Sequence, residues 1–392
     1  MYAVESHILV RGFAAGSATH VFDALLSVGF RLTRVLTNHE RAGLSVTADR
    51  QARVGVVGGG IRGSMFARAI SENPRAHLVA ICDQSSRVLQ GAATSFDVPT
   101  YGSVEAMVGA HPELTAAIVA TPDFAHRDAA VVCATHGLDL MIEKPLATTT
   151  ADAEAIIATA NKSGSRIMVG FENRWNPRFS TVRNLLRTVD GGRLITQQVS
   201  LNDTIFVPTK MLSWAEKSSP AWFLMPHTLD LAIWLSGTQP VSVYARGHRG
   251  VLAGLGINTW DSVSATFTMN DGSYVVLNSS WILPETAPAV YDFRYEIQTD
   301  STVFHIDGAN HGITQYGAAG VRWPQCAVFE RSGRITGIPI DMVNDFVGFV
   351  REGDTDVPTH EDGLLVTQAI EAVHESLAEG SIIELFPHVH KK

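Results

Sequence analysis

The sequence has few cysteines, no long apolar run and no block of basic residues. Its three cysteines, Cys82, Cys133 and Cys326, are odd in number and widely spaced, which excludes a disulfide framework and a zinc signature. No apolar run approaches the roughly 18 residues that a membrane span requires. A net charge of -9, with scattered lysine and arginine, argues against nucleic acid or an anionic membrane as a partner. We therefore expect a globular protein of a reducing cytoplasm, without a metal site.

The 392 residues, 45% of them hydrophobic, are enough to bury a substantial core and to form two domains. We expect residues 1–51 to be an N-terminal extension, either an appendage or a loosely ordered lead-in. They lack the basic start, apolar core and cleavage site of a secretory signal. Apolar residues from Val21 to Phe30 recur at helical spacing and allow one amphipathic helix. A mild excess of arginine leaves an organelle-targeting role open, although acidic residues are also present.

A glycine-rich turn follows an apolar strand at residues 53–63. The pattern is Gly58-x-Gly60-x-x-Gly63, and a helical run comes after it. Gly58 permits the tight turn, Gly60 lets the backbone approach a pyrophosphate, and Gly63 lets the helix pack close to the sheet. The N-terminus of that helix then faces the anion. We therefore predict a dinucleotide-binding turn, although an ordinary strand-to-helix turn can contain the same glycines.

An acidic residue stands at the end of the next predicted strand, residues 78–82. Asp83 follows Gly63 by twenty residues, which is the spacing of an acid that accepts hydrogen bonds from an adenosine ribose diol. Its charge would repel a 2'-phosphate, so we predict NAD rather than NADP. Arg87 could meet such a phosphate and leaves NADP open, but we favour its being a solvated charge on a helix.

From Val54 to about Phe171, short apolar strands alternate with helical stretches, as in a doubly wound parallel sheet. Further strands are predicted at residues 116–120, 138–142 and 166–170. The first of these ends at Thr121-Pro122 and the second at Glu143-Lys144-Pro145. Because ligands bind beyond the carboxyl ends of parallel strands, we expect both endings to line a cofactor crevice.

After Pro177 the pattern changes to alternation with period two, which indicates antiparallel strands. Strands are predicted at 194–201 and 241–245, and a hairpin at 263–280 turns at Asn270-Asp-Gly-Ser273. One helix, Pro226 to Leu235, ends before Gly237. Two more helices are predicted at 342–350 and 364–377, the second ending before Gly380.

The predicted fold class is α/β, with an N-terminal Rossmann domain and a C-terminal α/β domain that has a large open, mostly antiparallel sheet. We place the Rossmann domain at residues 52–172 and the substrate-binding and oligomerisation domain at 173–340. Residues 341–392 would form helices that pack back on the core. The open face of the second sheet is large enough for an oligomer interface.

Glu143-Lys144-Pro145 stands at the end of a buried parallel strand. Proline bars the strand from continuing and can adopt the cis peptide, which would fix how Lys144 projects. An ammonium held beside a nicotinamide can stabilise a developing alkoxide or polarise a carbonyl. A surface Lys-Pro turn is the alternative, and the glycine turn upstream favours the chemical interpretation.

His227 is the second candidate for catalysis. If Pro226 occupies the first turn of a helix, His227 lies near the positive end of the helix dipole, which favours a neutral imidazole that can act as a base. Asp230, three residues on, shares the helical face and could orient the imidazole. The sequence leaves a purely structural role for this histidine open.

Several motifs occur together in an order that resembles one known family. They are Gly58 to Gly63, Ala120-Thr-Pro-Asp-Phe-Ala-His126, Glu143-Lys-Pro-Leu146, Val169 to Pro177, His227-x-x-Asp230, Trp234-Leu-Ser-Gly237 and Glu361-Asp-Gly-Leu364. In this combination the chain resembles the glucose-fructose oxidoreductase, inositol dehydrogenase and rhizopine catabolism family, usually called Gfo/Idh/MocA. The match covers about residues 52–385 and leaves out the first fifty.

The resemblance implies NAD(P) and redox chemistry on a sugar, cyclitol or similar polyhydroxyl substrate. We expect a homodimer or homotetramer, formed through the C-terminal sheet. The expected catalytic residues are Lys144, His227 and Asp230. The expected cofactor-binding residues are Gly58, Gly60, Ile61, Arg62, Gly63, Asp83, Thr121, Pro122, His126, Glu143, Lys144 and Pro145. The residues expected on the substrate side are Asn173, Arg174, Asn176 and Phe223.

One position departs from the family pattern. Many members have an aspartate four residues before the histidine, where this chain has Phe223. The missing carboxylate weakens support for a protonated histidine and removes an acceptor for a substrate hydroxyl. With Trp222 and Met225, Phe223 indicates a more apolar substrate face, suited to an aryl or deoxy group or to stacking on a sugar ring. The alternative is that these side chains pack the domain core.

We therefore predict an NAD(P)-dependent dehydrogenase or reductase that moves a hydride between the nicotinamide and a carbinol carbon. His227 would take the hydroxyl proton, and Lys144 would stabilise the alkoxide-like oxygen. Two alternatives stay open. One is redox-assisted elimination or glycoside cleavage, in which bound NAD is reduced and regenerated within one cycle. The other is a non-catalytic NAD-dependent sensor.

Overall fold

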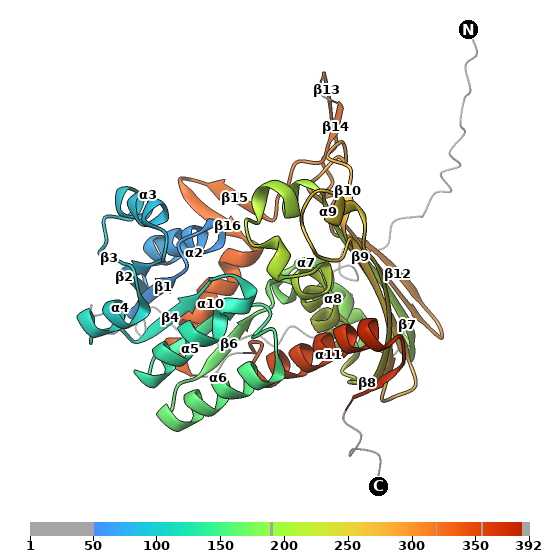
Figure 1. Cartoon of the computed structure of the whole chain (residues 1–392), viewed down its shortest axis with the longest axis horizontal. Helices are drawn as coiled ribbons and strands as arrows, with labels where there is room; N and C mark the ends of the chain where they lie inside the picture. The colour runs from blue at the N-terminus through green and yellow to red at the C-terminus, as the bar shows by residue number, and fades with distance from the viewer. Residues whose placement is uncertain (1–50, 189–190, 319, 354–355, 386–392) are drawn as a thin grey trace, which may run out of the picture. The chain divides into compact units, whose positions relative to one another are not determined.

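The computed structural model describes residues 51–188, 191–318, 320–353 and 356–385, which belong to one compact unit. The N-terminal extension, with the amphipathic helix expected at Val21 to Phe30, lies outside the described residues apart from Gln51. Figure 1 shows two sheets within the described unit, with helices packed on both.

The first sheet is parallel and has six strands in the order β3-β2-β1-β4-β5-β6. They are β1 (Ala52–Val57), β2 (Ala76–Cys82), β3 (Thr100–Tyr101), β4 (Ala116–Val119), β5 (Asp139–Glu143) and β6 (Ile167–Gly170). The order reverses between β1 and β4, so a crevice opens at the carboxyl ends of these strands. The predicted Rossmann sheet is confirmed.

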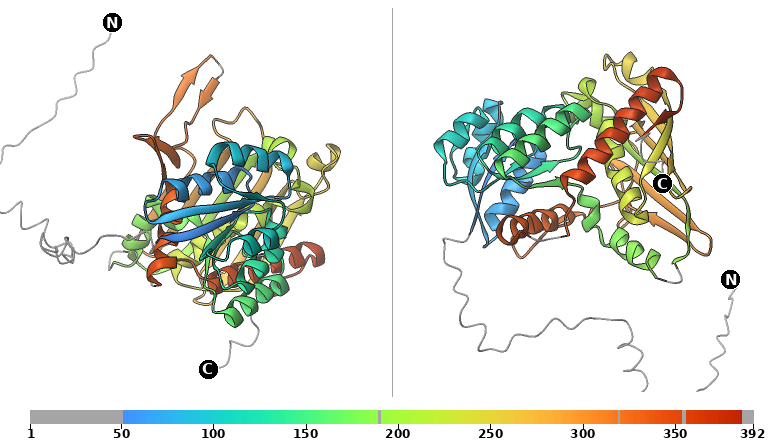
Figure 2. Two further views of the ribbon diagram at one scale, coloured as in Figure 1. Left: turned by 90° about the vertical axis from the view of Figure 1, so that its left-hand side faces the viewer. Right: turned by 90° about the horizontal axis from the view of Figure 1, so that it is seen from below.

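Helices cover both faces of this sheet (Figure 2). They are α2 (Ile61–Glu72), α3 (Ser86–Phe96), α4 (Val104–Ala110), α5 (His126–Thr135), α6 (Thr150–Ser163) and α10 (Ile338–Glu352). On one face, Phe66 of α2 and Phe346 of α10 share a buried core with β1 and β4. On the other, Cys133 of α5 and Ile156 of α6 are fully buried. A late segment of the chain thus completes the first domain.

The second sheet has seven strands in the order β12-β11-β7-β10-β9-β8-β17. They are β7 (Leu194–Thr204), β8 (Pro240–His248), β9 (Ser262–Met269), β10 (Tyr274–Leu283), β11 (Tyr291–Thr299), β12 (Val303–Asp307) and β17 (Ile383–Glu384). Only the β7–β10 pair is parallel among the described pairs of this sheet. The predicted hairpin is present as β9 and β10, and the open, mostly antiparallel sheet is confirmed.

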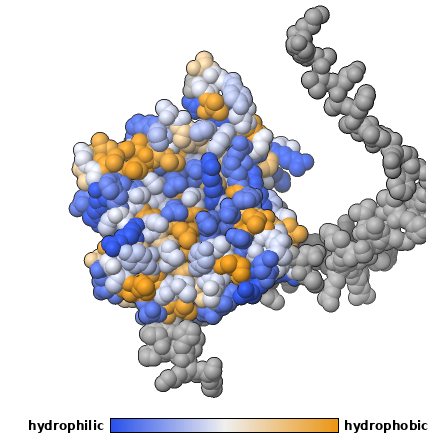
Figure 3. Space-filling view, turned by 90° about the vertical axis from the view of Figure 1, so that its right-hand side faces the viewer, coloured by the Kyte–Doolittle hydropathy of each residue, from blue (hydrophilic) through white to orange (hydrophobic). Residues whose placement is uncertain are grey.

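Three helices pack on the inner face of this sheet: α7 (Pro177–Leu186), α8 (Pro220–Ser236) and α11 (His360–Glu379). Figure 2 shows α11 running from the first domain to the second sheet. In β9, Val263, Ala265 and Phe267 are buried, whereas Ser264 and Thr266 face outward. The outer face mixes hydrophilic and hydrophobic side chains (Figure 3).

Helix α8 begins six residues earlier than predicted. Its N-cap is Ser219, whose Oγ accepts a hydrogen bond from the backbone N of Trp222 at 3.1 Å, and Pro220 occupies the first turn. Pro226 lies inside the helix. The prediction was wrong because either proline can signal a first turn, but only Pro220 follows a capping serine. The predicted stop at Gly237 is confirmed, with φ of 72°.

The segment between β12 and α10 contains two small hairpins that the sequence did not reveal, because their strands are too short to show alternation. They are β13 (Gln315–Gly317) with β14 (Gly320–Arg322), and β15 (Val328–Arg331) with β16 (Arg334–Gly337). The remaining short elements are η3 (Asp123–Ala125), η4 (Glu172–Trp175), η6 (Val207–Met211), η7 (Ala215–Lys217) and α9 (Val251–Gly254). Both predicted C-terminal helices are present, and each begins about one turn earlier than expected.

Candidate active site

Close backbone packing shapes the glycine turn between β1 and α2. Gly58 has φ of 90°, and a Cβ there would lie 2.5 Å from the carbonyl oxygen of Ala120. A Cβ on Gly63 would lie 1.7 Å from the carbonyl oxygen of Gly58, so α2 packs directly on the turn. A Cβ on Gly60 would meet open space at the N-terminus of α2, where Ile61 is 75% exposed. A pyrophosphate cradle needs these features.

Asp83 and Thr121 border this turn. Asp83 Oδ2 accepts a hydrogen bond from Gly59 N at 2.8 Å, and Oδ1 accepts one from Ser85 N at 2.8 Å. Each carboxylate oxygen has a further lone pair, so Asp83 can still accept from a ribose diol. Thr121 Oγ1 is buried and has no hydrogen-bond partner among the described residues, and a bound ligand would satisfy it. The turn, Asp83 and Thr121 therefore fit a dinucleotide.

Arg62 turns away from the expected phosphate site. Its Nη2 lies 2.6 Å from Glu143 Oε1 and 2.7 Å from Glu172 Oε2, so its guanidinium joins α2 to the ends of β5 and β6. Glu143 is buried and also accepts from the backbone N of Lys144 at 3.2 Å. The side chains of Arg62 and Glu143 thus bind each other, and their expected contact with the cofactor stays a prediction. They fix the strand end that carries Lys144.

Lys144 is held against helix α8. The Lys144–Pro145 peptide is cis, as the sequence allowed. Lys144 Nζ donates to the carbonyl oxygen of Phe223 at 2.8 Å and lies 4.4 Å from the centre of the Phe223 ring. Burial lowers the pKa of Lys144; Glu143 and Asp123 oppose this effect, and the charge of Arg62 adds to it. The lysine is a desolvated cation at the mouth of the crevice.

His227 lies one helical turn beyond the Phe223 carbonyl that holds Lys144. The structure therefore brings the two predicted catalytic residues together. Burial lowers the pKa of His227 well below its ordinary value, and the charges of Lys144 and Arg62 lower it further. The predicted cause, the helix dipole, is wrong, because His227 lies about two turns inside α8. Desolvation and neighbouring cations keep the imidazole neutral.

Asp230 and Arg174 bind each other, not His227 or the crevice. Arg174 Nε donates to Asp230 Oδ2 at 3.0 Å, and Arg174 Nη2 also lies 3.1 Å from Asp362 Oδ1. Burial raises the pKa of Asp230 to about 6, and Arg174 opposes that rise. Within the described structure, Asp230 makes this ion pair and no hydrogen bond with His227, so its orienting role and the substrate-facing role of Arg174 stay predictions. The pair joins η4 to α8 and α11.

Two further predicted residues are structural. Asn176 is buried and caps α7, because its Oδ1 accepts from the backbone N of Arg178 at 3.1 Å. His126 is 1% exposed, and its ring nitrogens lie 2.7 Å from the carbonyl oxygen of Pro145 and 3.0 Å from that of Thr121. His126 therefore ties the ends of β4 and β5 together, and its place beside the nicotinamide stays a prediction.

Asp203 is a site residue that the sequence analysis missed. It lies on β7, is 6% exposed, and its Oδ2 has no hydrogen-bond partner within the described ranges. Burial raises the pKa of Asp203 to about 7, while the nearby charge of Lys144 and the neighbouring Trp281 indole oppose the rise. An acid at an inward position of a strand was the signal that could have found it, because Val199 and Leu201 of β7 also point inward.

The described residues contain no cluster of His, Cys, Asp or Glu side chains that could hold a metal ion. Among the described helices, none has both the length and the apolar character needed to cross a membrane.

The glycine cradle and the desolvated lysine beside a neutral histidine define a dinucleotide-dependent oxidoreductase. The family model for an oxidoreductase family with an NAD-binding Rossmann fold, GFO_IDH_MocA, matches residues 52–171. The model of the GFO/IDH/MocA C-terminal domain matches residues 179–304. The chain therefore belongs to the Gfo/Idh/MocA family of NAD-binding oxidoreductases, which confirms the resemblance seen in its motifs.

Several characterised proteins are similar over most of their length. Inositol 2-dehydrogenase of Rhizobium meliloti is 24% identical over 83% of this chain and 97% of its own. The NAD-dependent scyllo-inositol 2-dehydrogenase of Bacillus subtilis is 23% identical over 86% of this chain and 97% of its own. The structure of myo-inositol 2-dehydrogenase from Lactobacillus plantarum aligns with a TM-score of 0.75 at 19% identity, covering 86% of this chain and 99% of the other. The structural likeness confirms the fold.

Proposed function

We propose that this protein transfers a hydride between NAD and a carbinol carbon of a polyhydroxyl substrate such as a sugar or cyclitol. The observation that carries the proposal is the hydrogen bond of Lys144 to α8, one turn from a neutral His227. The names of similar proteins, which include inositol dehydrogenases and a D-apiose dehydrogenase, support the substrate class.

In this mechanism His227 accepts the proton of the substrate hydroxyl, and the Lys144 ammonium stabilises the alkoxide-like oxygen that remains. Bound NAD supplies the hydride acceptor. The Asn173 amide lies 3.4 Å from His227 Nδ1. If the amide oxygen faces this nitrogen, Nδ1 donates to Asn173 and Nε2 stays available as the base.

The remaining polar groups of the crevice can hold substrate hydroxyls. Asp203 presents a buried carboxylate oxygen without a partner among the described residues, and Glu172 has one oxygen beyond its ion pair with Arg62. Both acids lie near Lys144. The charge of Glu172 raises the pKa of Lys144, and the charge of Lys144 lowers the pKa of Asp203. Together they offer a substrate hydrogen-bond acceptors from η4 and β7, whereas the Phe223 side chain of α8 offers none.

The test is a substrate screen with two site variants and one control. Inositols, aldoses and glycosides are offered with NAD, and free NADH is followed by absorbance. Lys144→Met and His227→Gln should each lower kcat by about 100-fold or more, with NAD affinity nearly unchanged by calorimetry. Lys162→Met, an exposed change in the last turn of α6, should behave as wild type. Undiminished turnover in Lys144→Met would contradict the assignment.

A redox-assisted elimination or hydration is the second candidate. A similar protein from Mediterraneibacter gnavus, 25% identical over 62% of this chain, is named 2,7-anhydro-N-acetylneuraminate hydratase. Such a cycle returns the hydride to the substrate, so it consumes substrate without releasing NADH. Product formation without any rise in NADH absorbance would favour this candidate over simple dehydrogenation.

We also retain three proposals about the whole chain. The catalytic groups come from a Rossmann domain at residues 52–172 and a substrate domain at 173–340. The C-terminal segment, 341–392, contributes helices that pack on both domains. A homodimer or homotetramer forms through the outer face of the second sheet, which mass measurement in solution would test. The cytoplasm is the proposed compartment, and cell fractionation would test it.

A further inference from the structure

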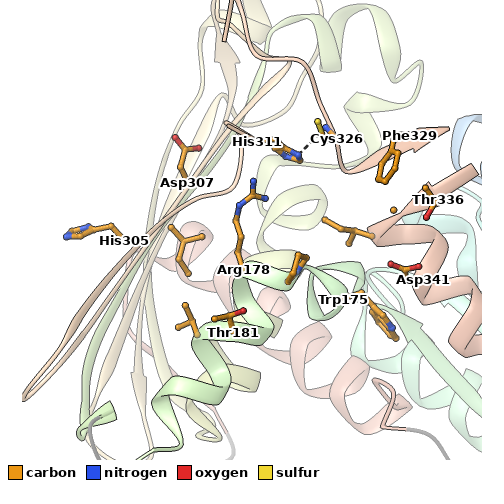
Figure 4. Close-up of a pocket in the computed structure, with 15 residues that line it drawn as sticks. Trp175, Arg178, Thr181, His305, Asp307, His311, Cys326, Phe329, Thr336 and Asp341 are labelled. Carbon is orange, nitrogen blue, oxygen red and sulfur yellow. Dashed lines mark hydrogen bonds between the residues drawn. The ribbon is translucent and has the colours of Figure 1, made fainter. Parts of the chain in front are cut away.

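A cavity of about 830 Å³ lies between α7, the edge strand β12, the start of α10 and the β15–β16 hairpin (Figure 4). Its volume falls in the range of roughly 300–1,000 Å³ that is usual for small-molecule sites. Neither the sequence motifs nor the mechanism above uses this cavity. The family model for the second domain ends at residue 304, whereas one wall of the cavity comes from residues 305–341.

Arg178 of α7 supplies the hydrogen-bond donors of this cavity. Figure 4 shows its side chain rising into the space toward His311. In the described part of the chain, no ion pair or side-chain hydrogen bond engages its guanidinium. His311 is already occupied, because its Nε2 lies 3.1 Å from the carbonyl oxygen of Gly308 and its Nδ1 accepts from Cys326 N at 3.1 Å. Arg178 therefore presents several N–H groups to a ligand.

Other lining residues supply acceptors and flat apolar surfaces. Asp341, Thr181 and Thr336 bring a carboxylate and two hydroxyls to the lining. The Trp175 ring is fixed by a 2.7 Å hydrogen bond from Nε1 to Asp345, and the Phe329 ring is 48% exposed. Donors, acceptors and aromatic faces around one space suit a sugar ring, whose hydroxyls both donate and accept and whose C–H face packs on aromatic rings. The carboxylate facing Arg178 disfavours a phosphate or other anion.

Tyr291 connects this cavity with the candidate active site. Its hydroxyl donates to Gln325 Oε1 at 2.7 Å, and Gln325 Nε2 donates to the carbonyl oxygen of Ala309 at 3.1 Å. Burial raises the pKa of Tyr291. The charges of Glu172 and Asp203 raise this pKa further, and the charge of Arg178 lowers it. Tyr291 pairs with Asp203 across β11 and β7, and Gln325 precedes the cavity residue Cys326, so the tyrosine joins the strand that carries Asp203 to a wall of the cavity.

We propose that the cavity is a second saccharide subsite. On this view the substrate is a glycoside or disaccharide, whose reacting ring lies at Lys144 and His227 and whose second ring lies between Arg178, Trp175 and Phe329. This inference rests on the proposed function, since it places the reacting ring in that site. The segment from β12 to α10, beyond the matched family domain, then selects the second ring.

The experiment measures binding separately from turnover. Full-length protein carrying Lys144→Met, with NAD present, is titrated calorimetrically with cellobiose, maltose and galactinol, and with glucose and myo-inositol as single rings. At least one two-ring ligand should bind about tenfold or more tightly than its single ring. Adding Arg178→Met or Phe329→Ala should abolish that gain, because a charged hydrogen bond or a stacked ring is lost. Arg187→Met, an exposed change at the end of the same helix, should preserve it.

The possible outcomes separate the two proposals. If single rings are oxidised by wild-type protein but no two-ring ligand gains affinity through Arg178, this inference fails and the proposed function stands. If a two-ring ligand binds through Arg178 but wild-type protein transforms nothing, the proposed function fails and the subsite stands. Tighter binding of glucose 6-phosphate than of any disaccharide, lost in Arg178→Met, would show an anion site and overturn the inference.

Discussion

Replacing Phe223 by leucine should change the pH dependence of catalysis. The Phe223 ring lies 4.4 Å from Lys144 Nζ, whereas the hydrogen bond that Nζ donates at 2.8 Å goes to the backbone carbonyl of residue 223 and survives the substitution. A partly desolvated cation–π contact contributes roughly 0.5–2 kcal/mol. Because about 1.4 kcal/mol corresponds to one pKa unit, losing the ring should lower the pKa of Lys144 by about 0.4–1.5 units.

The direction of this pH shift depends on which protonation state of Lys144 is active in catalysis. Stabilising an alkoxide requires the ammonium, so activity is lost as the pH rises through the pKa of Lys144, which burial already lowers. Phe223→Leu should therefore shift the basic limb of kcat/KM to lower pH. Phe223→Asp, which places a carboxylate beside the ammonium, should shift it to higher pH. The assay is NADH formation from the best substrate of the screen across about pH 6–10.

Trp222→Leu is the matched control for this series. Trp222 is the adjacent aromatic residue of α8 and stacks on His374 at 5.1 Å, away from Lys144. Its loss should lower stability without moving the basic limb. Coincident basic limbs for wild type and Phe223→Leu, in variants that remain folded by circular dichroism, would refute the idea that the ring supports the charge of Lys144.

Three further outcomes are expected. Gly63→Ala should weaken NAD binding more than tenfold in calorimetry, because its Cβ would lie 1.7 Å from the Gly58 carbonyl oxygen, whereas Gly109→Ala, whose Cβ meets open space, should not. Asp230→Ala should cost about 3 kcal/mol in urea unfolding, because it removes the buried partner of Arg174 and leaves only the partly exposed Asp362; an unchanged midpoint would contradict the structural assignment. Folding raises the pKa of Asp203 to about 7, so ionisation of this carboxyl destabilises the native state as the pH rises. The gain in Tm from Asp203→Asn should therefore grow from about pH 4 to 7 and then level off. A gain that does not depend on pH would contradict the raised pKa of Asp203.

The parallel sheet and the glycine turn were predictable because their signals are local. A tight turn, an apolar strand and an acid at a fixed spacing all lie within about thirty residues of one another. The start of α8 was also a local signal, but two prolines competed for it, and Ser219 decided between them through its capping hydrogen bond. The small hairpins before α10 had no such signal, since their strands are only three or four residues long.

The sequence anticipated the placement of site residues where the backbone determines it, and missed the ion pairs that side chains form with partners far away in the chain. Lys144 lies at a strand end and His227 on a buried helix, and both follow from element placement. Arg62, Arg174 and Asp230 instead found oppositely charged groups more than fifty residues away in the chain. Spacing along a helix suggested that Asp230 supports His227, but a buried carboxylate gains more from a guanidinium than from a neutral imidazole.

The charge balance of the crevice indicates where a substrate hydroxyl can find its acceptor. Glu143 is paired with Arg62, and Phe223 occupies the position on α8 where the family resemblance led us to expect a carboxylate. The unpartnered oxygen of Asp203 is presented from β7, on the strand side of Lys144. A hydrogen-bond acceptor on strand β7 binds a different substrate hydroxyl, relative to the reacting carbon, than an acceptor on helix α8 would. Asp203→Asn should therefore raise KM most for substrates with a hydroxyl next to the reacting carbon and least for their deoxy analogues.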